Sequence, residues 1–77
     1  MTPAAFNLMR ALTCSVAEDE AAADDMLEIV EQIEDRRDPH AATLRTLARM
    51  HRAKAIANRA RLEALAIEYD RRTNTRI

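Results

Sequence analysis

Few residues in this chain have the types and spacing that chemistry requires. Asp19, His51 and Asn58 are polar residues at positions where apolar or small ones otherwise recur, so they could form a polar site inside a helical bundle. Catalysis needs a nucleophile held beside a base, and the sequence contains no motif for that arrangement. We therefore expect these three residues to form one or two polar layers that set the register of packed helices.

Metal and cofactor sites are not indicated either. The chain has two histidines, one cysteine and no CxxC pair, which does not make a zinc site, and it lacks the Glu-x-x-His pairs of diiron bundles. Because there is no glycine, there is no glycine-rich phosphate loop. We therefore expect no catalytic residue, no metal, no cofactor and no enzymatic activity.

Two further residues have chemical alternatives. Cys14 is either a buried apolar residue or, if a helix began at residue 15, a thiol activated by a helix N-terminus, and we expect the former. His40 falls in the first turn of a predicted helix, where we expect it to be solvated.

The composition predicts a single all-α domain over residues 1–77. The chain has no glycine and only two prolines, and it is rich in Ala, Leu, Glu and Arg, which favour helices. Thr2-Pro3 and Asp38-Pro39 each place a capping side chain before a proline, a combination typical of helix N-termini. These signals predict a helix over about 3–37, a second over about 39–72 and a frayed tail at 73–77.

The short connection predicts that these helices fold back as an antiparallel helical hairpin. In both segments apolar or small residues recur every three or four positions, so the helices should pack at a shallow angle, as in a coiled coil. Matching positions across the turn place Ala23 near His51, Asp19 near Ala55, and Ser15 or Val16 near Asn58.

A break in the first helix is the alternative. Ser15-Val16-Ala17-Glu18 has the pattern of a capping box, which would interrupt the chain near residues 13–15 and give a short third helix. The unbroken apolar stripe and the lack of glycine favour a continuous helix.

Charge separates the two helices. One side of the first helix carries an acidic strip, formed by Glu20, Asp24, Glu28, Glu31 and Asp35. The second helix carries a basic strip, formed by Arg45, Arg49, Arg52 and Arg59. Antiparallel docking brings the strips together, so we expect the acids to select the partner helix and its direction. The alternative is that the acidic strip binds a basic partner protein.

The second helix also has an apolar face opposite its packing stripe. This outer face consists of Met50, Ala53, Ile56, Ala57, Ala60, Ala64 and Ile67. A helix that is apolar on two faces lies between neighbours, and 77 residues without a disulfide or metal are close to the lower limit for an independent core. We therefore expect the hairpin to self-associate, most simply as a homodimer that forms a four-helix bundle.

These features favour an interaction protein. The chain shows neither a signal peptide nor a membrane-spanning stretch, so we expect it to be soluble and cytoplasmic. We expect a small non-enzymatic adaptor, assembly subunit or stoichiometric inhibitor that binds itself and another protein. The alternative is a nucleic-acid-binding regulator that uses the basic strip, although that strip has no aromatic residues to stack on bases.

Overall fold

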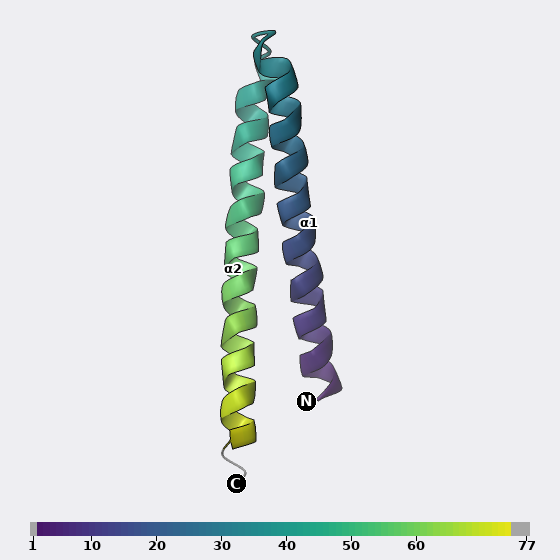
Figure 1. Cartoon of the computed structure of the whole chain (residues 1–77), viewed down its shortest axis with the longest axis vertical. Coiled ribbons are helices and arrows are strands. Elements are labelled where there is room, and N and C mark those ends of the chain that lie inside the picture. The colour runs from purple at the N-terminus through teal and green to yellow at the C-terminus, as the bar shows by residue number, and fades with distance from the viewer. Residues whose placement is uncertain (1, 75–77) are drawn as a thin grey trace.

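The computed structural model describes residues 2–74, with side chains described for residues 2–72. Two long helices, α1 (Pro3–Glu34) and α2 (His40–Asn74), lie side by side and antiparallel (Figure 1). They form a rod with principal dimensions of 63 × 17 × 13 Å. The prediction of an all-α antiparallel hairpin is confirmed.

The start of α1 is fixed by capping and by a contact with α2. Thr2 Oγ1 accepts a hydrogen bond from the backbone N of Ala5 at 3.2 Å, and Pro3 occupies the first helical turn. The backbone N of Thr2 also donates to the hydroxyl of Tyr69 at 2.6 Å. The N-terminal end of α1 is therefore joined to the C-terminal half of α2.

α1 is continuous, so the alternative of a break near residues 13–15 is wrong. The side chains that would cap a new helix there have other partners. Thr13 Oγ1 donates to the carbonyl of Met9 at 2.8 Å, and Ser15 Oγ accepts a hydrogen bond from Asn58 Nδ2 at 3.2 Å. The capping-box pattern thus occurs inside a helix, where Ser15 packs against α2 instead.

α1 ends at Glu34, before the predicted end at residue 37. Arg37 has a φ of 55°, a left-handed conformation that stops the helix, and the chain has no glycine to take this position. The backbone N of Arg36 and of Arg37 donate to the carbonyls of Ile33 and Glu34 at 3.0 and 3.1 Å. These short-range bonds satisfy the last carbonyls of the helix.

α2 begins where Asp38 caps it. Asp38 Oδ1 accepts hydrogen bonds from the backbone N of His40 at 2.9 Å and from its ring Nδ1 at 2.7 Å. These hydrogen bonds, the backbone one first, hold the pKa of Asp38 below its ordinary value.

α2 also extends further than predicted. It runs to Asn74 and so includes the first two residues of the predicted tail at 73–77, while residues 75–77 lie outside the described part of the chain. Arg71 and Arg72 lie in its last turn, where positive charge stabilises the C-terminal end of a helix.

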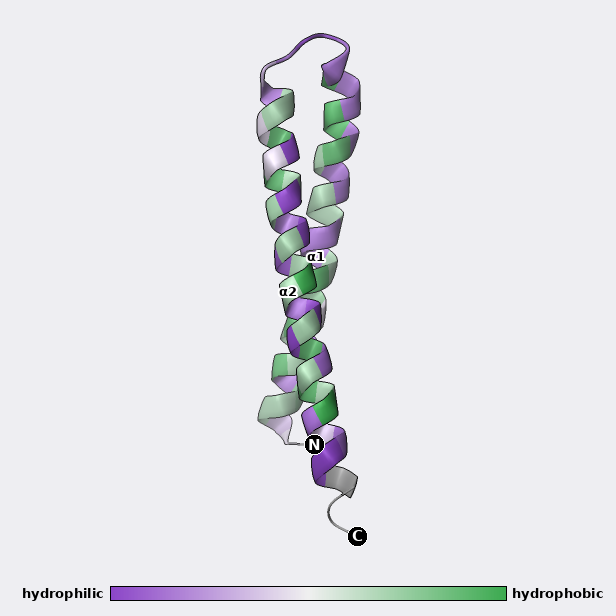
Figure 2. Ribbon diagram, turned by 90° about the vertical axis from the view of Figure 1, so that its left-hand side faces the viewer, coloured by the Kyte–Doolittle hydropathy of each residue, from purple (hydrophilic) through white to green (hydrophobic). Residues whose placement is uncertain are grey.

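The helices pack through a thin seam of mostly small residues. The buried residues are Val16, Asp19, Ala23, Val30, Ala41, Ala48, Ala55 and Asn58. In both helices these positions follow the heptad spacing of three and four, while polar and apolar residues alternate along the ribbons (Figure 2). Ala23 is completely buried, which is consistent with close approach of the helices at the middle of the hairpin.

Larger apolar residues remain partly exposed. They are Phe6, Leu8, Ile29, Leu47, Met50, Ile56 and Ile67. In a hairpin, each helix buries only the face that packs against the other helix, so these apolar side chains are not buried within the hairpin.

Candidate functional site

A buried carboxylate and a histidine meet near the middle of the hairpin. Asp19 lies in the seam with its side chain 8% exposed, and its Oδ1 accepts a hydrogen bond from His51 Nδ1 at 2.7 Å. Lys54 Nζ lies 3.6 Å from the same oxygen. The other carboxylate oxygen, Oδ2, is buried without a hydrogen-bond partner among the described residues. The sequence pattern placed Asp19 near Ala55 and His51 near Ala23. In the structure, the side chains of Asp19 and His51 instead reach diagonally along the seam and contact each other.

The environment favours the ionised form of Asp19. The hydrogen bond from His51 holds the pKa of Asp19 below its ordinary value of 3.8, the charge of Lys54 acts in the same direction, and burial acts against both. Because an ionised carboxylate only accepts hydrogen bonds, His51 Nδ1 carries the proton of this bond. The pair joins α1 to α2 at one relative position, as a polar layer in a coiled coil does.

A second polar contact lies one heptad further along α2. Asn58 is buried; its Nδ2 donates to Ser15 Oγ at 3.2 Å, and its Oδ1 accepts from Arg61 Nη1 at 2.6 Å. The predicted proximity of Ser15 to Asn58 is confirmed. A slide of one heptad would break this contact together with the Asp19–His51 contact, so both oppose other registers of the hairpin.

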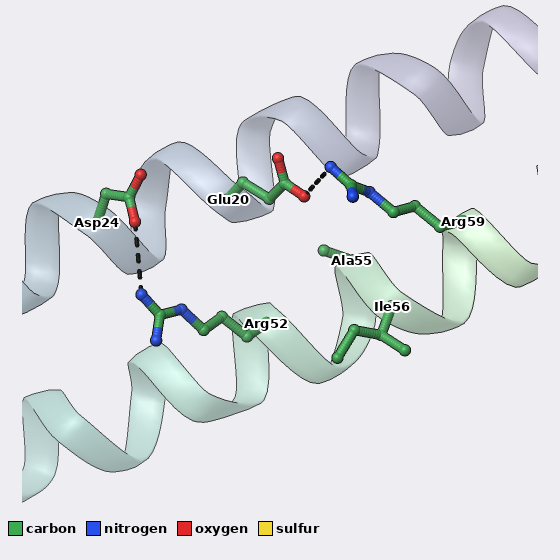
Figure 3. Close-up of a pocket in the computed structure, with 6 residues that line it drawn as sticks. All are labelled: Glu20, Asp24, Arg52, Ala55, Ile56 and Arg59. Carbon is green, nitrogen blue, oxygen red and sulfur yellow. Dashed lines mark ion pairs between the residues drawn. The ribbon is translucent and has the colours of Figure 1, made fainter.

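The acidic and basic strips meet along one side of the seam (Figure 3). Glu20 forms an ion pair with Arg59, and Asp24 forms one with Arg52 at 3.5 Å. The four side chains are at least 43% exposed, so each pair contributes at most about 1 kcal/mol. The predicted pairing of the strips is confirmed for these residues.

The rest of the acidic strip does not reach α2. The side chains of Glu28, Glu31 and Asp35 form no ion pair or hydrogen bond with any described residue. The two steps of four from Glu20 to Glu28 exceed one heptad by one residue, so Glu28 lies on the outer side of α1, as does Asp35 one heptad later. Glu31 lies one heptad after Asp24, but the arginine one heptad before Arg52 is Arg45, which pairs with Glu34. The expectation that all five acids lie beside the basic strip is therefore wrong.

The sequence prediction missed Glu34, which pairs with Arg45 near the turn. Glu34 lies two heptads after Glu20, as Arg45 lies two heptads before Arg59, so heptad spacing was the signal that could have identified this pair. The remaining arginine of the basic strip, Arg49, contacts Thr46 Oγ1 of its own helix at 3.5 Å.

Neutralising one paired and one unpaired acid should separate the stabilisation by ion pairs with α2 from the repulsion between acids along α1. Glu20→Gln removes the partner of Arg59 and should lower the free energy of unfolding by up to about 1 kcal/mol at low salt and by less at high salt. Glu28→Gln is the matched control: it breaks no ion pair and relieves repulsion of about 0.2–0.5 kcal/mol from Asp24 and Glu31. Urea denaturation at two salt concentrations measures both. Equal effects of the two variants would contradict the assignment of the pair.

The outer face of α2 is exposed along its length. Ile56 is 69% exposed, Ile67 63% and Met50 59%, and the alanines between them are exposed as well. In Figure 3, Ala55 points towards α1 while Ile56 points away from it. The structure thus places these residues on one continuous surface that α1 does not cover.

The predictions for the environments of His40 and Cys14 have different outcomes. His40 is exposed, as predicted. Cys14 is exposed and not buried, so its prediction is wrong: it lies outside the heptad seam, on the side of α1 that faces away from α2. Because α1 does not begin at residue 15, the thiol also lacks the helix N-terminus that would activate it.

Neither metal binding, membrane insertion nor similarity to known proteins adds a functional assignment. Among the described residues, no three His, Cys, Asp or Glu side chains are placed to hold a metal ion. Neither described helix has an apolar stretch long enough to cross a membrane. No protein-family model matches the chain, and no curated protein and no solved structure matches it.

Proposed function

We propose that this chain is a small non-enzymatic interaction protein whose contact surface is the outer face of α2. The observation that carries the proposal is the exposure of Met50, Ile56 and Ile67 on a helix whose opposite side already packs on α1. Exposed apolar surface of this continuity is typical of protein contact sites. Adaptor, assembly subunit and stoichiometric inhibitor are the roles that such a rod can have, and a cytoplasmic location is part of the proposal.

The shape of the hairpin also supports a binding role over an enzymatic one. A rod 17 × 13 Å across has a single seam of side chains between its helices, and reaction centres need a site from which water is excluded. The Asp19–His51 pair lies in that seam, where its contacts are with the neighbouring helix.

The basic strip gives less support to nucleic acid binding. Arg45, Arg52 and Arg59 each have a carboxylate partner on α1. A phosphate backbone would have to compete with these carboxylates for the same guanidinium groups.

Capture from an extract of the source organism tests the proposal. Ile56→Asp places a charge on the outer face and should remove the captured proteins, whereas Ala11→Glu, at an exposed position on α1, should leave capture unchanged. Quantitative mass spectrometry compares both variants with the parent chain. Capture that is insensitive to Ile56→Asp would contradict the proposal. Capture of RNA or DNA that falls steeply with salt would favour the basic strip instead.

A further inference from the structure

We propose that the outer face of α2 binds the same face of a second copy of this chain, antiparallel and about a two-fold axis. The inference rests on the proposed function, because it names the partner of the same surface. Three observations on the molecule support it: the exposed area, the order of side-chain sizes and the order of flanking charges.

A single hairpin leaves more surface exposed than a compact protein of its size. The chain exposes 6150 Å², whereas a folded monomer of 8.7 kDa exposes about 4,700 Å². The excess, about 1,400 Å², is larger than the roughly 800 Å² that each partner buries in a standard protein interface. The chain therefore has enough uncovered surface for a stable dimer.

Along α2, the outer face has one large side chain at each end and small side chains between them, so its pattern of sizes reads the same from either end. At heptad spacing the face presents, in order, Met50, Ala53, Ala57, Ala60, Ala64 and Ile67. Antiparallel pairing about a two-fold axis sets Met50 against Ile67 of the second copy and sets the alanines against one another. The small residues let the two α2 helices approach closely along a seam about 27 Å long.

The charges beside this seam also select the antiparallel direction. One flank carries Arg49 at its beginning and Asp70 at its end, and the other flank carries Lys54 and then Glu68. On the first flank, antiparallel pairing brings Arg49 of each copy to the acidic end of the other copy, whereas parallel pairing aligns like charges. The second flank is mixed, because Arg61 lies between Lys54 and Glu68. Arg61 is the flanking charge nearest the two-fold axis of the dimer. Its Nη1 donates a hydrogen bond at 2.6 Å to Oδ1 of Asn58, a residue of the hairpin seam.

The two seams of α2 determine the arrangement of the dimer. Because the outer face lies opposite the side that packs on α1, the two α2 helices lie at the centre and the two α1 helices lie outside. The four helices thus form a layer. A square four-helix bundle would instead need the apolar faces to lie on adjacent sides of α2.

Sedimentation equilibrium of the full chain tests the association. At micromolar concentration the parent chain should have twice the 8.7 kDa chain mass, and Ala60→Glu should raise the dissociation constant by at least about 100-fold, because it puts an unpaired carboxylate in the apolar seam of each copy. Ala11→Glu, on the exposed side of α1, should leave the dimer intact. A parent chain that is a helical monomer would overturn the proposal, as would a dimer that Ala60→Glu does not weaken.

Disulfide trapping tests the direction without requiring a variant monomer to fold. In a Cys14→Ser background, chains with Ala53→Cys and chains with Ala64→Cys should cross-link to each other when mixed and oxidised, because antiparallel pairing places these positions face to face. Each variant alone should give no disulfide dimer. A disulfide dimer from Ala53→Cys alone, or none from the mixture, would overturn the antiparallel arrangement.

Failure of this inference is distinguishable from failure of the proposed function. A monomeric parent chain whose capture of another protein is lost with Ile56→Asp would overturn the dimer and leave the interaction surface in place. A monomeric parent chain whose capture is unaffected by Ile56→Asp would overturn both.

Discussion

Ala23→Leu should lower the free energy of unfolding by about 1–3 kcal/mol, since it adds a larger side chain where the seam has no space. Ala23 is 0% exposed, and Ala48 and Ala55 are buried in the same seam. A leucine at this position forces α1 and α2 apart or adopts a strained rotamer. For a domain of this size the loss corresponds to a fall in melting temperature of roughly 4–8 °C for each kcal/mol.

The matched control for this prediction is Ala21→Leu. Residue 21 lies in the same helix but is exposed, and Ala and Leu have similar helix propensities, so the control should change stability little. Both variants are compared by urea denaturation at one protein concentration, because self-association would make stability depend on concentration. Equal stability of the two variants would mean that the helices are not closely packed at Ala23.

Most of the fold follows from local signals in the sequence. The Thr2-Pro3 and Asp38-Pro39 pairs mark both helix starts, and the heptad recurrence of small and apolar residues predicts which sides pack. The alanines of the central seam predict its thinness, and the hydrogen bond between Ser15 and Asn58 confirms the register. These features could be predicted because each depends on residues close in sequence or on a simple period.

The features that were missed depend on side-chain direction in three dimensions. The acidic strip has spacings of four, four, three and four, and its second step of four places Glu28 and then Asp35 away from the seam, whereas Glu34 stays beside it. The diagonal contact between Asp19 and His51 depends on how side chains lean along their helices. The exposure of Cys14 follows from its place outside the heptad seam, a signal that was present in the sequence but was outweighed by the usual burial of cysteine.

The charge pattern of α1 now has a structural explanation in two parts. Glu20 and Asp24 lie close enough to α2 to form ion pairs, while Asp19, their neighbour, is directed into the seam. The side chains of Glu28, Glu31 and Asp35 have no ion pair among the described residues and retain their mutual repulsion, whereas Glu34 pairs with Arg45. Residues that are adjacent in the sequence therefore have different roles, because successive helical positions face different surroundings.

His51→Ala should destabilise the hairpin more than any substitution in the ion pairs on the surface. It leaves the buried Asp19 carboxylate with only Lys54, whose Nζ is 3.6 Å away, while Oδ2 already lacks a partner among the described residues. Replacing both residues with leucine removes the polar groups together, so the double variant should recover stability relative to His51→Ala. Its expected defect is a less specific register, visible as broadened amide resonances in NMR spectra.

Acid titration gives this prediction a definite sign. Because the pKa of Asp19 is lower in the folded chain than its ordinary value of 3.8, its stabilising effect is complete above that value and is lost as the pH falls through the folded-state pKa. His51 and Lys54 are the titratable groups that face it from α2. The stability difference between the parent chain and Asp19→Asn, measured by urea denaturation from pH 5 to pH 2, should therefore shrink towards the acid end. Carboxyl groups titrate in this range, and the comparison with Asp19→Asn isolates the contribution of this carboxylate. A difference that stays constant over the range would show that the Asp19 charge has no part in holding the two helices together.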